Sequence, residues 1–383
     1  MKIKLKLLIV VPGGVHPSGE VEVIPALLTL YRELSKQHDV FIIAMQQHNE
    51  HTEYRLLGCQ VISLAKVKSR QFLHARRICI GRLKYYSFKP NLIHSFWLGK
   101  TTLFASMLSQ KYKVPLLASI GGGEPVHLPE ISYGGSNSTI NRLINRVCIK
   151  LANATTCGSE YVQAKALFRW GLKSRVIPLG IDTHFWSLKR IENIGVKQWQ
   201  ILHIASINRV KDPWLLLDVV LGLKQNGLNF HLNWVGEDTL EGAVQQKSRA
   251  MGLTQYISFH GFKTQVQLKK IMEKVPQHFI IQTSKYESQG VAIAEACSQG
   301  ICPVGTNVGW LSDLGIGLSV SPQVKTSLSG DLVEQILLLS SNYKARQVRV
   351  DLAQQWIKCC DLAVTVKRFN MQYSELFIYS STL

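Results

Sequence analysis

Hydrophobic and polar positions along the 383-residue chain follow two alternating patterns. Short apolar runs, typical of buried strands, are followed by stretches in which apolar residues recur every three or four positions, as in amphipathic helices. In the first half the predicted strands are 7–11, 40–44, 61–64, 92–94 and 116–120, and the predicted helices are 21–37, 70–88, 101–110 and 139–151. Because strands that alternate with helices form βαβ units, this half is predicted to be an α/β domain with a parallel sheet.

The alternation begins again near residue 200. The predicted strands are 200–205, 231–235, 257–260 and 279–281, and the predicted helices are 213–225, 240–251, 265–274, 291–298, 332–339 and 364–377. Between the two series, Pro178 and Gly180 predict a hinge, and the polar stretch 188–198 predicts a linker. Since the chain is longer than one core usually supports, we expect two domains, residues 1–183 and 184–360, followed by a last segment, 361–383.

Composition excludes several classes of protein. Hydrophobic residues make up 46% of the chain and charged residues 18%, which excludes a disordered protein. No apolar run reaches the roughly 18 residues that a membrane-spanning helix needs, and the apolar run 7–11 is too short for the core of a signal peptide. The eight cysteines show no CxxC or CxxH spacing, so we expect neither a zinc site nor disulfides, and a reducing cytosol.

The net charge of +19 is distributed unevenly. Residues 1–183 carry 24 Lys and Arg against 10 Asp and Glu, whereas residues 184–383 carry 20 against 15. Eight of these cations lie in the segment 66–89, interleaved with aromatic and aliphatic residues. Such a segment is either a helix that binds an anionic membrane surface or a solvated helix face, and both interpretations stay open. No nucleic-acid-binding module accompanies the charge, so we expect no nucleic acid partner.

Candidate ligand-binding residues follow several predicted strands, at the edge where open α/β sheets bind ligands. They are Gly13 and Gly14 after strand 7–11, Gly122, Gly123 and Glu124 after strand 116–120, and Gly261 and Phe262 after strand 257–260. Glycine lets a ligand approach the backbone closely. These positions are therefore candidates for contact with a substrate.

The stretch 279–300 is the most informative part of the chain. An apolar strand ends at Ile281, a polar turn carries Glu287 and Gly290, and the helix 291–298 contains Glu295. The start of that helix, at Val291, offers free N–H groups and a positive dipole end to an anion such as phosphate. The turn and helix start therefore predict an anion-binding site.

Residues 284–309, SKYESQGVAIAEACSQGICPVGTNVG, resemble the donor-site signature of the retaining glycosyltransferases of family 4, the group 1 glycosyl transferases of GT-B fold. The family pattern is Ser-x-x-Glu-x-x-Gly, a second Glu followed by Ala about eight residues after the first, and then a Gly with a following Pro-Val. Residues 176–186 resemble the family's crossing between domains, and in residues 204–213 Lys211 matches the lysine that holds the nucleotide diphosphate.

The resemblance implies two Rossmann-like domains whose parallel sheets face each other across a cleft, with the helix in 361–383 packed on the first domain. It implies transfer of a hexose, with retention, from a nucleoside diphosphate sugar to a glycan or lipid-linked acceptor in cell-envelope polysaccharide or glycolipid synthesis. No metal and no cofactor beyond the donor substrate are expected. The expected location is the cytoplasm; if the basic segment 66–89 binds anionic lipid, the protein lies at the inner face of the cytoplasmic membrane.

The resemblance also implies roles for the candidate residues. We expect Glu287, Lys211 and Arg209 to be catalytic, Glu295, Gly290, Val291, Gly13, Gly14, Gly261 and Phe262 to bind the donor, and Gly122, Gly123 and Glu124 to bind the acceptor or the donor sugar.

Two positions depart from the family pattern. Ser206 stands where an arginine is usual, so that the nearby Arg209 either contacts the phosphates or is solvated. Gly121 stands where a strand-end histidine is common, and His16, His94 and His127 are candidates to replace it, among which the sequence does not choose. These departures leave a second function open, that of a GT-B-shaped protein that binds a nucleotide sugar without turnover.

Overall fold

The computed structural model describes residues 3–190, 196–319 and 327–381, and the chain divides into two compact units. The first unit is Met1–Gly180 together with Leu362–Leu383, and the second is Ile181–Asp361. The sequence prediction set the boundaries at 183/184 and 360/361. Residues 191–195 of the expected linker lie outside the described residues.

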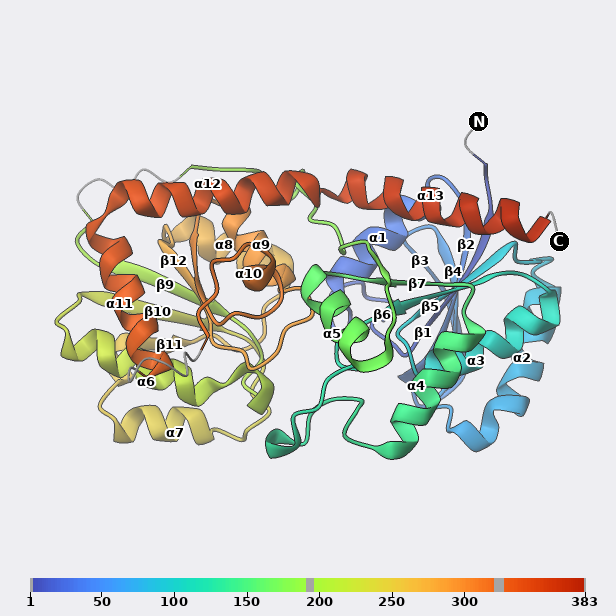
Figure 1. Ribbon diagram of the computed structural model, residues 1–383, viewed down its shortest axis with the longest axis horizontal. Coiled ribbons are helices and arrows are strands. Elements are labelled where there is room, and N and C mark those ends of the chain that lie inside the picture. The colour runs from blue at the N-terminus through green and yellow to red at the C-terminus, as the bar shows by residue number, and fades with distance from the viewer. Residues whose placement is uncertain (1–2, 191–195, 320–326, 382–383) are drawn as a thin grey trace. The chain divides into compact units, whose positions relative to one another are not determined.

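Within the described residues, the first unit contains an eight-stranded sheet of order β3-β4-β2-β1-β5-β6-β7-β8 (Figure 1). The strands are β1 (Lys6–Val11), β2 (Asp39–His48), β3 (Thr52–Leu56), β4 (Cys59–Ala65), β5 (Leu92–Phe96), β6 (Leu116–Ile120), β7 (Ala154–Cys157) and β8 (Arg175–Val176). β1, β2, β4, β5, β6, β7 and β8 pair in parallel, which confirms the predicted parallel sheet, although β7 and β8 were not among the predicted strands. β3 pairs antiparallel with β4, which the sequence analysis did not foresee.

The β3–β4 hairpin was missed because β3 is mostly half-exposed and polar, so it lacks the apolar run of a buried strand. Its two-residue turn, Leu57 and Gly58, has positive φ at both positions (51° and 82°). That backbone conformation matches the right-handed twist of a tight hairpin and favours glycine.

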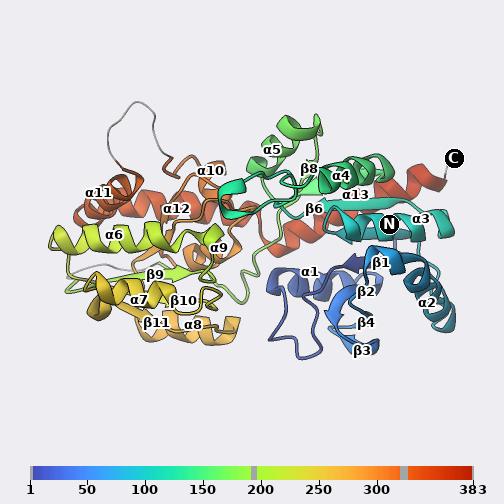
Figure 2. The same cartoon turned by 90° about the horizontal axis from the view of Figure 1, so that it is seen from below.

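The sheet of the first unit has helices on both faces (Figure 2). The helices are α1 (Pro25–Ser35), α2 (Phe72–Tyr85), α3 (Lys100–Tyr112), α4 (Thr139–Leu151), α5 (Glu160–Trp170) and α13 (Leu362–Ser381). Leu7 and Ile9 of β1 pack in one core with α1 and α13, whereas Leu8 and Val10 pack in another core with α2 and α3. Since successive side chains of a strand point to opposite faces, these helix pairs cover opposite faces.

α13 is held against the rest of the first unit by buried polar contacts as well as by apolar packing. The Nδ1 of His94 lies 2.8 Å from the hydroxyl of Tyr373, and the Nε2 lies 2.8 Å from the Oγ of Ser119. All three side chains are buried, and burial lowers the pKa of His94 to about 3, so its imidazole is neutral. A second contact joins the Nε2 of His38 to the Oδ1 of Asn370 at 2.8 Å.

The second unit contains, within its described residues, a parallel five-stranded sheet of order β11-β10-β9-β12-β13. The strands are β9 (Trp199–Ile204), β10 (Phe230–Val235), β11 (Ile257–Phe259), β12 (Phe279–Gln282) and β13 (Cys302–Gly305). The helices are α6 (Pro213–Gln225), α7 (Ala243–Ala250), α8 (Gln265–Lys274), α9 (Val291–Ser298), α10 (Trp310–Asp313), α11 (Leu328–Ser341) and α12 (Tyr343–Cys359). α12 was not predicted, because its buried face includes the polar side chains of Arg346 and Gln354 and so breaks the apolar periodicity.

The contact between His94 and Tyr373 generates a stability prediction. Tyr373→Phe keeps the shape of the side chain but leaves the Nδ1 of His94 unpaired in the core, and an unpaired buried polar group costs about 1–3 kcal/mol. We expect a lower midpoint of urea unfolding for the first unit. Tyr85→Phe, at a tyrosine that is 71% exposed, is the matched control and should leave the midpoint unchanged. Equal midpoints for both variants would show that this hydrogen bond contributes no net stability.

Candidate functional site

The candidate residues of the second unit meet where the order of its sheet reverses. The chain leaves β9 toward β10 on one side and reaches β12 on the other, so β9 and β12 flank the topological switch point, where α/β sheets bind ligands beyond the carboxyl ends of the strands. The loop after β9 contains the short 3-10 helix η3 (Arg209–Lys211), and the loop after β12 leads into α9.

Two ion pairs join these two loops. The Nζ of Lys211 lies 2.5 Å from the Oε1 of Glu287, which also accepts a hydrogen bond of 2.7 Å from the Oγ of Ser284. The Nζ of Lys285 lies 2.7 Å from the Oδ2 of Asp212. The backbone adds a third link, because the N–H of Lys285 donates to the carbonyl of Val210 at 2.8 Å. The structure therefore brings Lys211 and Glu287, which are 76 positions apart in sequence, into direct contact.

The start of α9 lies beside this ion pair. Gly290 precedes the helix with a φ of 85°, and no side chain caps the helix there. Within the described residues, the N–H groups of Val291 and Ala292 in the first turn donate to no other group. Together with the positive end of the helix dipole, they offer two free donors to an anion.

A pocket of about 160 Å³ connects these features. Its lining includes Lys211, Glu287, Val291 and Ala292. Ligand pockets for whole small molecules usually enclose about 300–1,000 Å³, so this pocket has the size of a phosphate group or two rather than of a complete nucleotide sugar. Its chemistry combines a cation, an anion and free N–H donors.

The sequence analysis missed two polar residues that line the same pocket. The Nδ1 of His203 lies 2.8 Å from the carbonyl oxygen of Ile281, and because a carbonyl only accepts, Nδ1 carries the proton. The Nε2 of His203 and the amide nitrogen of Gln282 are buried and have no partner within the described residues. Burial lowers the pKa of His203 to about 4, so its Nε2 is a neutral acceptor. A histidine inside the apolar run of β9 was the signal that could have identified it.

Glu295 lies on α9 but outside the lining of that pocket. Its side chain is 8% exposed, its Oε1 accepts a hydrogen bond of 2.7 Å from the amide of Gln265, and Trp186 also donates to the carboxyl group. Burial raises the pKa of Glu295 from 4.5 to about 8, although both hydrogen bonds lower it. The carboxyl group is therefore mostly protonated at neutral pH.

The remaining predicted residues of the second unit lie farther from the ion pair. Arg209 is exposed on η3, and no ion pair or hydrogen bond of its side chain occurs within the described residues. Gly261 and Phe262 follow β11 at the edge of the sheet, and Phe262 is 53% exposed. None of the three lines the small pocket. Their roles stay predictions.

The first unit carries its predicted residues near its own switch point, between β1 and β5. Gly13 and Gly14 follow β1, and the φ of Gly14 is 82°. After β6, the N–H groups of Gly121 and Gly122 donate to the two carboxylate oxygens of Glu124, at 2.9 and 2.7 Å. Burial nevertheless raises the pKa of Glu124. The carboxylate thus shapes its own loop, together with Gly123, and keeps lone pairs for a ligand hydroxyl.

Comparison with known families shows which family the chain belongs to. The model described as Glycosyltransferase Family 4 matches residues 26–185, and the model described as Glycosyl transferases group 1 matches residues 184–356. Together they cover the chain from residue 26 to residue 356.

The chain belongs to this glycosyltransferase family. A curated relative, the putative glycosyltransferase EpsF of Bacillus subtilis (strain 168), is 27% identical over 184 residues. The match covers 44% of this chain and 46% of the relative, so it spans less than half of the relative's length.

Solved structures of glycosyltransferases are similar over nearly the whole chain. Anabaena HepE in complex with UDP and glucose has 14% identity and a TM-score of 0.72, covering 96% of this chain and 99% of that one. Sucrose-phosphate synthase from Thermosynechococcus elongatus has 14% identity and a TM-score of 0.77, covering 98% and 100%. At these identities the likeness shows the fold, which is the predicted GT-B fold.

Gly121 stands where the resemblance led us to expect a strand-end histidine, and the ring of Trp97 lies against it. A Cβ atom at Gly121 would lie 2.5 Å from the Cδ2 of Trp97, the residue that follows β5. Of the three candidate histidines, His94 is buried with both ring nitrogens bonded and does not face solvent. His127 is exposed, and the Nδ1 of His16 lies 2.8 Å from the Oγ of Ser18. The indole ring of Trp97 therefore fills the space that a side chain at position 121 would enter.

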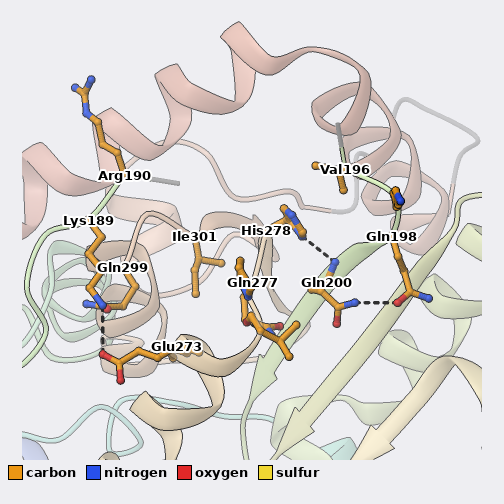
Figure 3. A pocket seen from close by; sticks show the side chains of 14 residues that line it. Lys189, Arg190, Val196, Gln198, Gln200, Glu273, Gln277, His278, Gln299 and Ile301 are labelled. Carbon is orange, nitrogen blue, oxygen red and sulfur yellow. Dashed lines mark hydrogen bonds and ion pairs between the residues drawn. The ribbon is translucent and has the colours of Figure 1, made fainter. Parts of the chain in front are cut away.

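A larger pocket, of about 730 Å³, lies at the opposite end of the second sheet of this glycosyltransferase (Figure 3). Figure 3 shows Lys189 and Glu273 paired across one side of it, and the ring of His278 accepting from the N–H of Gln200. Its lining includes Arg190 and Val196, between which the chain lies outside the described residues. Because it is at the amino ends of β9 and β12, we do not assign it to the donor. Among the described residues, no group of three or more His, Cys, Asp or Glu could hold a metal ion.

The buried carboxyl group of Glu295 predicts a pH-dependent stability. Below about pH 4.5 the group is protonated in both the folded and the unfolded chain. As pH rises toward 8, the unfolded chain loses the proton and the folded protein keeps it, so stability falls, by at most about 1.4 kcal/mol per pH unit.

Glu295→Gln removes this titration while its amide oxygen still accepts from Gln265 and Trp186. We expect the variant and the wild type to melt alike near pH 4.5, and the variant to be the more stable of the two at pH 8. Differential scanning calorimetry across this range measures the difference. A difference between the two that does not change with pH would contradict the raised pKa.

Proposed function

We propose that this protein transfers a hexose, with retention at the anomeric carbon, from a nucleoside diphosphate sugar to a glycan or lipid-linked acceptor in cell-envelope polysaccharide or glycolipid synthesis. The observation that carries the proposal is the meeting of Lys211, Glu287 and the free N–H groups of α9 at the switch point of the second sheet. Family membership supports sugar transfer. The HepE structures with UDP and with UDP-glucose support the class of donor.

The free N–H groups of Val291 and Ala292 suit the donor's diphosphate. When the bond between the sugar and the diphosphate breaks, negative charge builds on the leaving phosphate oxygens. Preorganised N–H donors, a helix dipole and a nearby ammonium stabilise that charge without reorganising in the transition state. Lys211, whose side chain is only 25% exposed, supplies the ammonium.

Glu287 then has a separate role. In the free protein its carboxylate neutralises Lys211, but a diphosphate would compete for the same ammonium. Next to phosphate oxygens a carboxylate is unfavourable unless it gains hydrogen-bond donors, and the hydroxyl groups of the donor sugar are such donors. Binding of the complete donor therefore transfers Lys211 from Glu287 to the diphosphate and gives Glu287 the sugar hydroxyls or the developing positive charge of the sugar ring.

The nucleoside end of the donor extends beyond the 160 Å³ pocket. Glu295 and the residues after β11, Gly261 and Phe262, are the candidates to meet it. Ribose hydroxyls that donate to Glu295 would stabilise its ionised form. Donor binding should therefore lower the pKa of that group.

A panel of nucleoside diphosphates and their sugars tests the donor class. A ligand at a hundredfold excess over its Kd stabilises the protein by about 2.7 kcal/mol, which a thermal shift detects. We expect one nucleoside diphosphate to raise the melting temperature and the corresponding nucleoside diphosphate sugar to raise it further. We expect free nucleoside diphosphate to be released when a lipid extract supplies the acceptor. Stabilisation without any release would favour the alternative, a nucleotide-sugar-binding protein without turnover. No stabilisation by any member of the panel would contradict both functions.

The two cations of the β9 loop give a second test. Lys211→Ala removes the ammonium from the pocket and should lower kcat by roughly 100-fold, the typical cost of losing one transition-state donor. Arg209→Ala, at an exposed residue, should change kcat by no more than about threefold.

Lys285→Ala is the matched control, because it breaks the neighbouring ion pair between the same two loops without removing a cation from the pocket. Steady-state kinetics with the donor found by the panel measures all three variants. If kcat falls more in Arg209→Ala than in Lys211→Ala, Arg209 supplies the cation that the family usually has at position 206.

A further inference from the structure

The outer face of α4 has an unusual distribution of side chains. A helix on the surface of a globular protein normally buries its apolar side chains and exposes its polar ones. In α4 the two buried residues are Asn145 and Cys148. Ile140, Leu143 and Val147, which lie three and four positions apart, are 70%, 63% and 39% exposed. The helix therefore presents an apolar stripe outward.

The orientation of α4 is fixed by its inner contacts. The Sγ of Cys148 donates to the carbonyl of Gly99, and the Oγ of Ser138 accepts from the N–H of Asn141 at the helix start. Ile144 and Ile149, both half-buried, pack in the small core that α4 shares with α5. A rotation that buried the outer stripe would expose these residues, so the stripe is a stable feature of the first unit.

Cations flank the stripe. Arg142, Arg146 and Lys150 are all exposed, and α4 contains no acidic residue. The chain around it is basic as well, with 24 Lys and Arg against 10 Asp and Glu over residues 1–183. Cations beside an apolar stripe complement a surface that has anionic groups above an apolar layer.

We infer that α4 is the segment that docks this protein on an anionic lipid surface, with Ile140, Leu143 and Val147 inserted below the headgroups and the three cations at their level. This matches an interfacial helix, whose apolar face enters the headgroup boundary by about 5–10 Å. A protein partner fits less well, because stable interfaces bury about 20–30 residues a side and this stripe has three apolar residues. The inference rests on the proposed lipid-linked acceptor for its purpose, but lipid binding itself requires no turnover.

The structure favours α4 over the basic segment 66–89 that the sequence suggested. In α2 the apolar residues Phe72, Ala75, Cys79 and Leu83 are buried in the core of the first unit. Arg82 is paired with Glu53 of the hairpin. Leu73 and Tyr85 remain strongly exposed, at 67% and 71%. α3 lies between α2 and α4 (Figure 1). The cations of α2 therefore add to the positive electrostatic potential of the helical layer that contains α4. None of the helices in the described ranges has an apolar stretch of the length that spanning a bilayer requires.

Sedimentation with vesicles of phosphatidylcholine alone, or with phosphatidylglycerol added, tests the inference. The stripe variant is Ile140→Gln with Leu143→Gln and Val147→Gln, which keeps the helix because glutamine is a good helix former. The control is Leu338→Gln with Val348→Gln, at exposed apolar residues (60% and 61%) of α11 and α12 in the second unit. A charge variant, Arg142→Gln with Arg146→Gln and Lys150→Gln, keeps the stripe, and Arg77→Gln with Lys84→Gln probes α2.

We expect the wild type to bind the anionic vesicles only, and less at 1 M salt, where the Debye length falls to about 3 Å. The stripe variant should lose at least about 30-fold in partition coefficient and the charge variant about tenfold or more, while the control should bind as the wild type does. Melting curves, and the thermal shift with the nucleotide panel, confirm that each variant is folded and report the donor site separately.

Three results would overturn the inference. A stripe variant that binds like the wild type would move docking away from α4, and to α2 if Arg77→Gln with Lys84→Gln abolishes binding. A wild type that binds no vesicle would leave the stripe without a lipid role, whatever the nucleotide panel shows. A dimer in light scattering that the stripe variant abolishes, without vesicle binding, would make the stripe an interface between copies of this chain.

Discussion

Parallel strands impose one constraint on which both units depend. A connection between two parallel strands must cross a face of the sheet, so the carboxyl ends of these strands all lie at the same edge. Only where the strand order reverses do two adjacent loops at that edge run in opposite directions and leave space between them. In the second sheet that place lies between β9 and β12, where Lys211 meets Glu287. In the first it lies between β1 and β5; Trp97, which follows β5, packs on Gly121 at the end of the neighbouring β6. The chemistry of each unit thus follows from its topology.

The sequence predicted much of this architecture because the predicted elements bury regular apolar faces. The bounds of α4, α6, α8 and α9 match the predicted ranges. α4, α6 and α8 begin at a capping side chain or a proline, α9 follows Gly290, and each ends where the pattern stops. Among the elements that were missed, β3 and α12 bury mixed or polar faces, so that no period in hydrophobicity marks them. The predicted ranges also left out β7, β8, β13, α5 and α10, all of which are short except α5. The antiparallel hairpin depends on backbone conformation at Leu57 and Gly58, which a strand pattern does not encode.

The candidate site was less predictable than the fold. Motif spacing located Lys211 and Glu287, but their contact arises from loop geometry, and the unpaired nitrogens of His203 and Gln282 become meaningful only when their burial is known. The protonation of Glu295 depends on its surroundings in three dimensions in the same way. These groups each impose a cost on the folded protein, as an unpaired polar atom or as a buried acid. Such costs are typical of residues that are kept for binding rather than for stability.

α13 gives the chain an order of assembly. The first unit is made of two segments separated by the whole of the second unit, since its last helix begins at Leu362. During synthesis the second unit is complete and able to fold while the first still lacks one of its two covering helices on the α1 face. Until that helix emerges, His94 lacks its tyrosine partner, and the apolar face of β1 at Leu7 and Ile9 is only partly covered. The nascent first unit is therefore the part of this protein most exposed to aggregation and to chaperones, and it is completed last although it begins first.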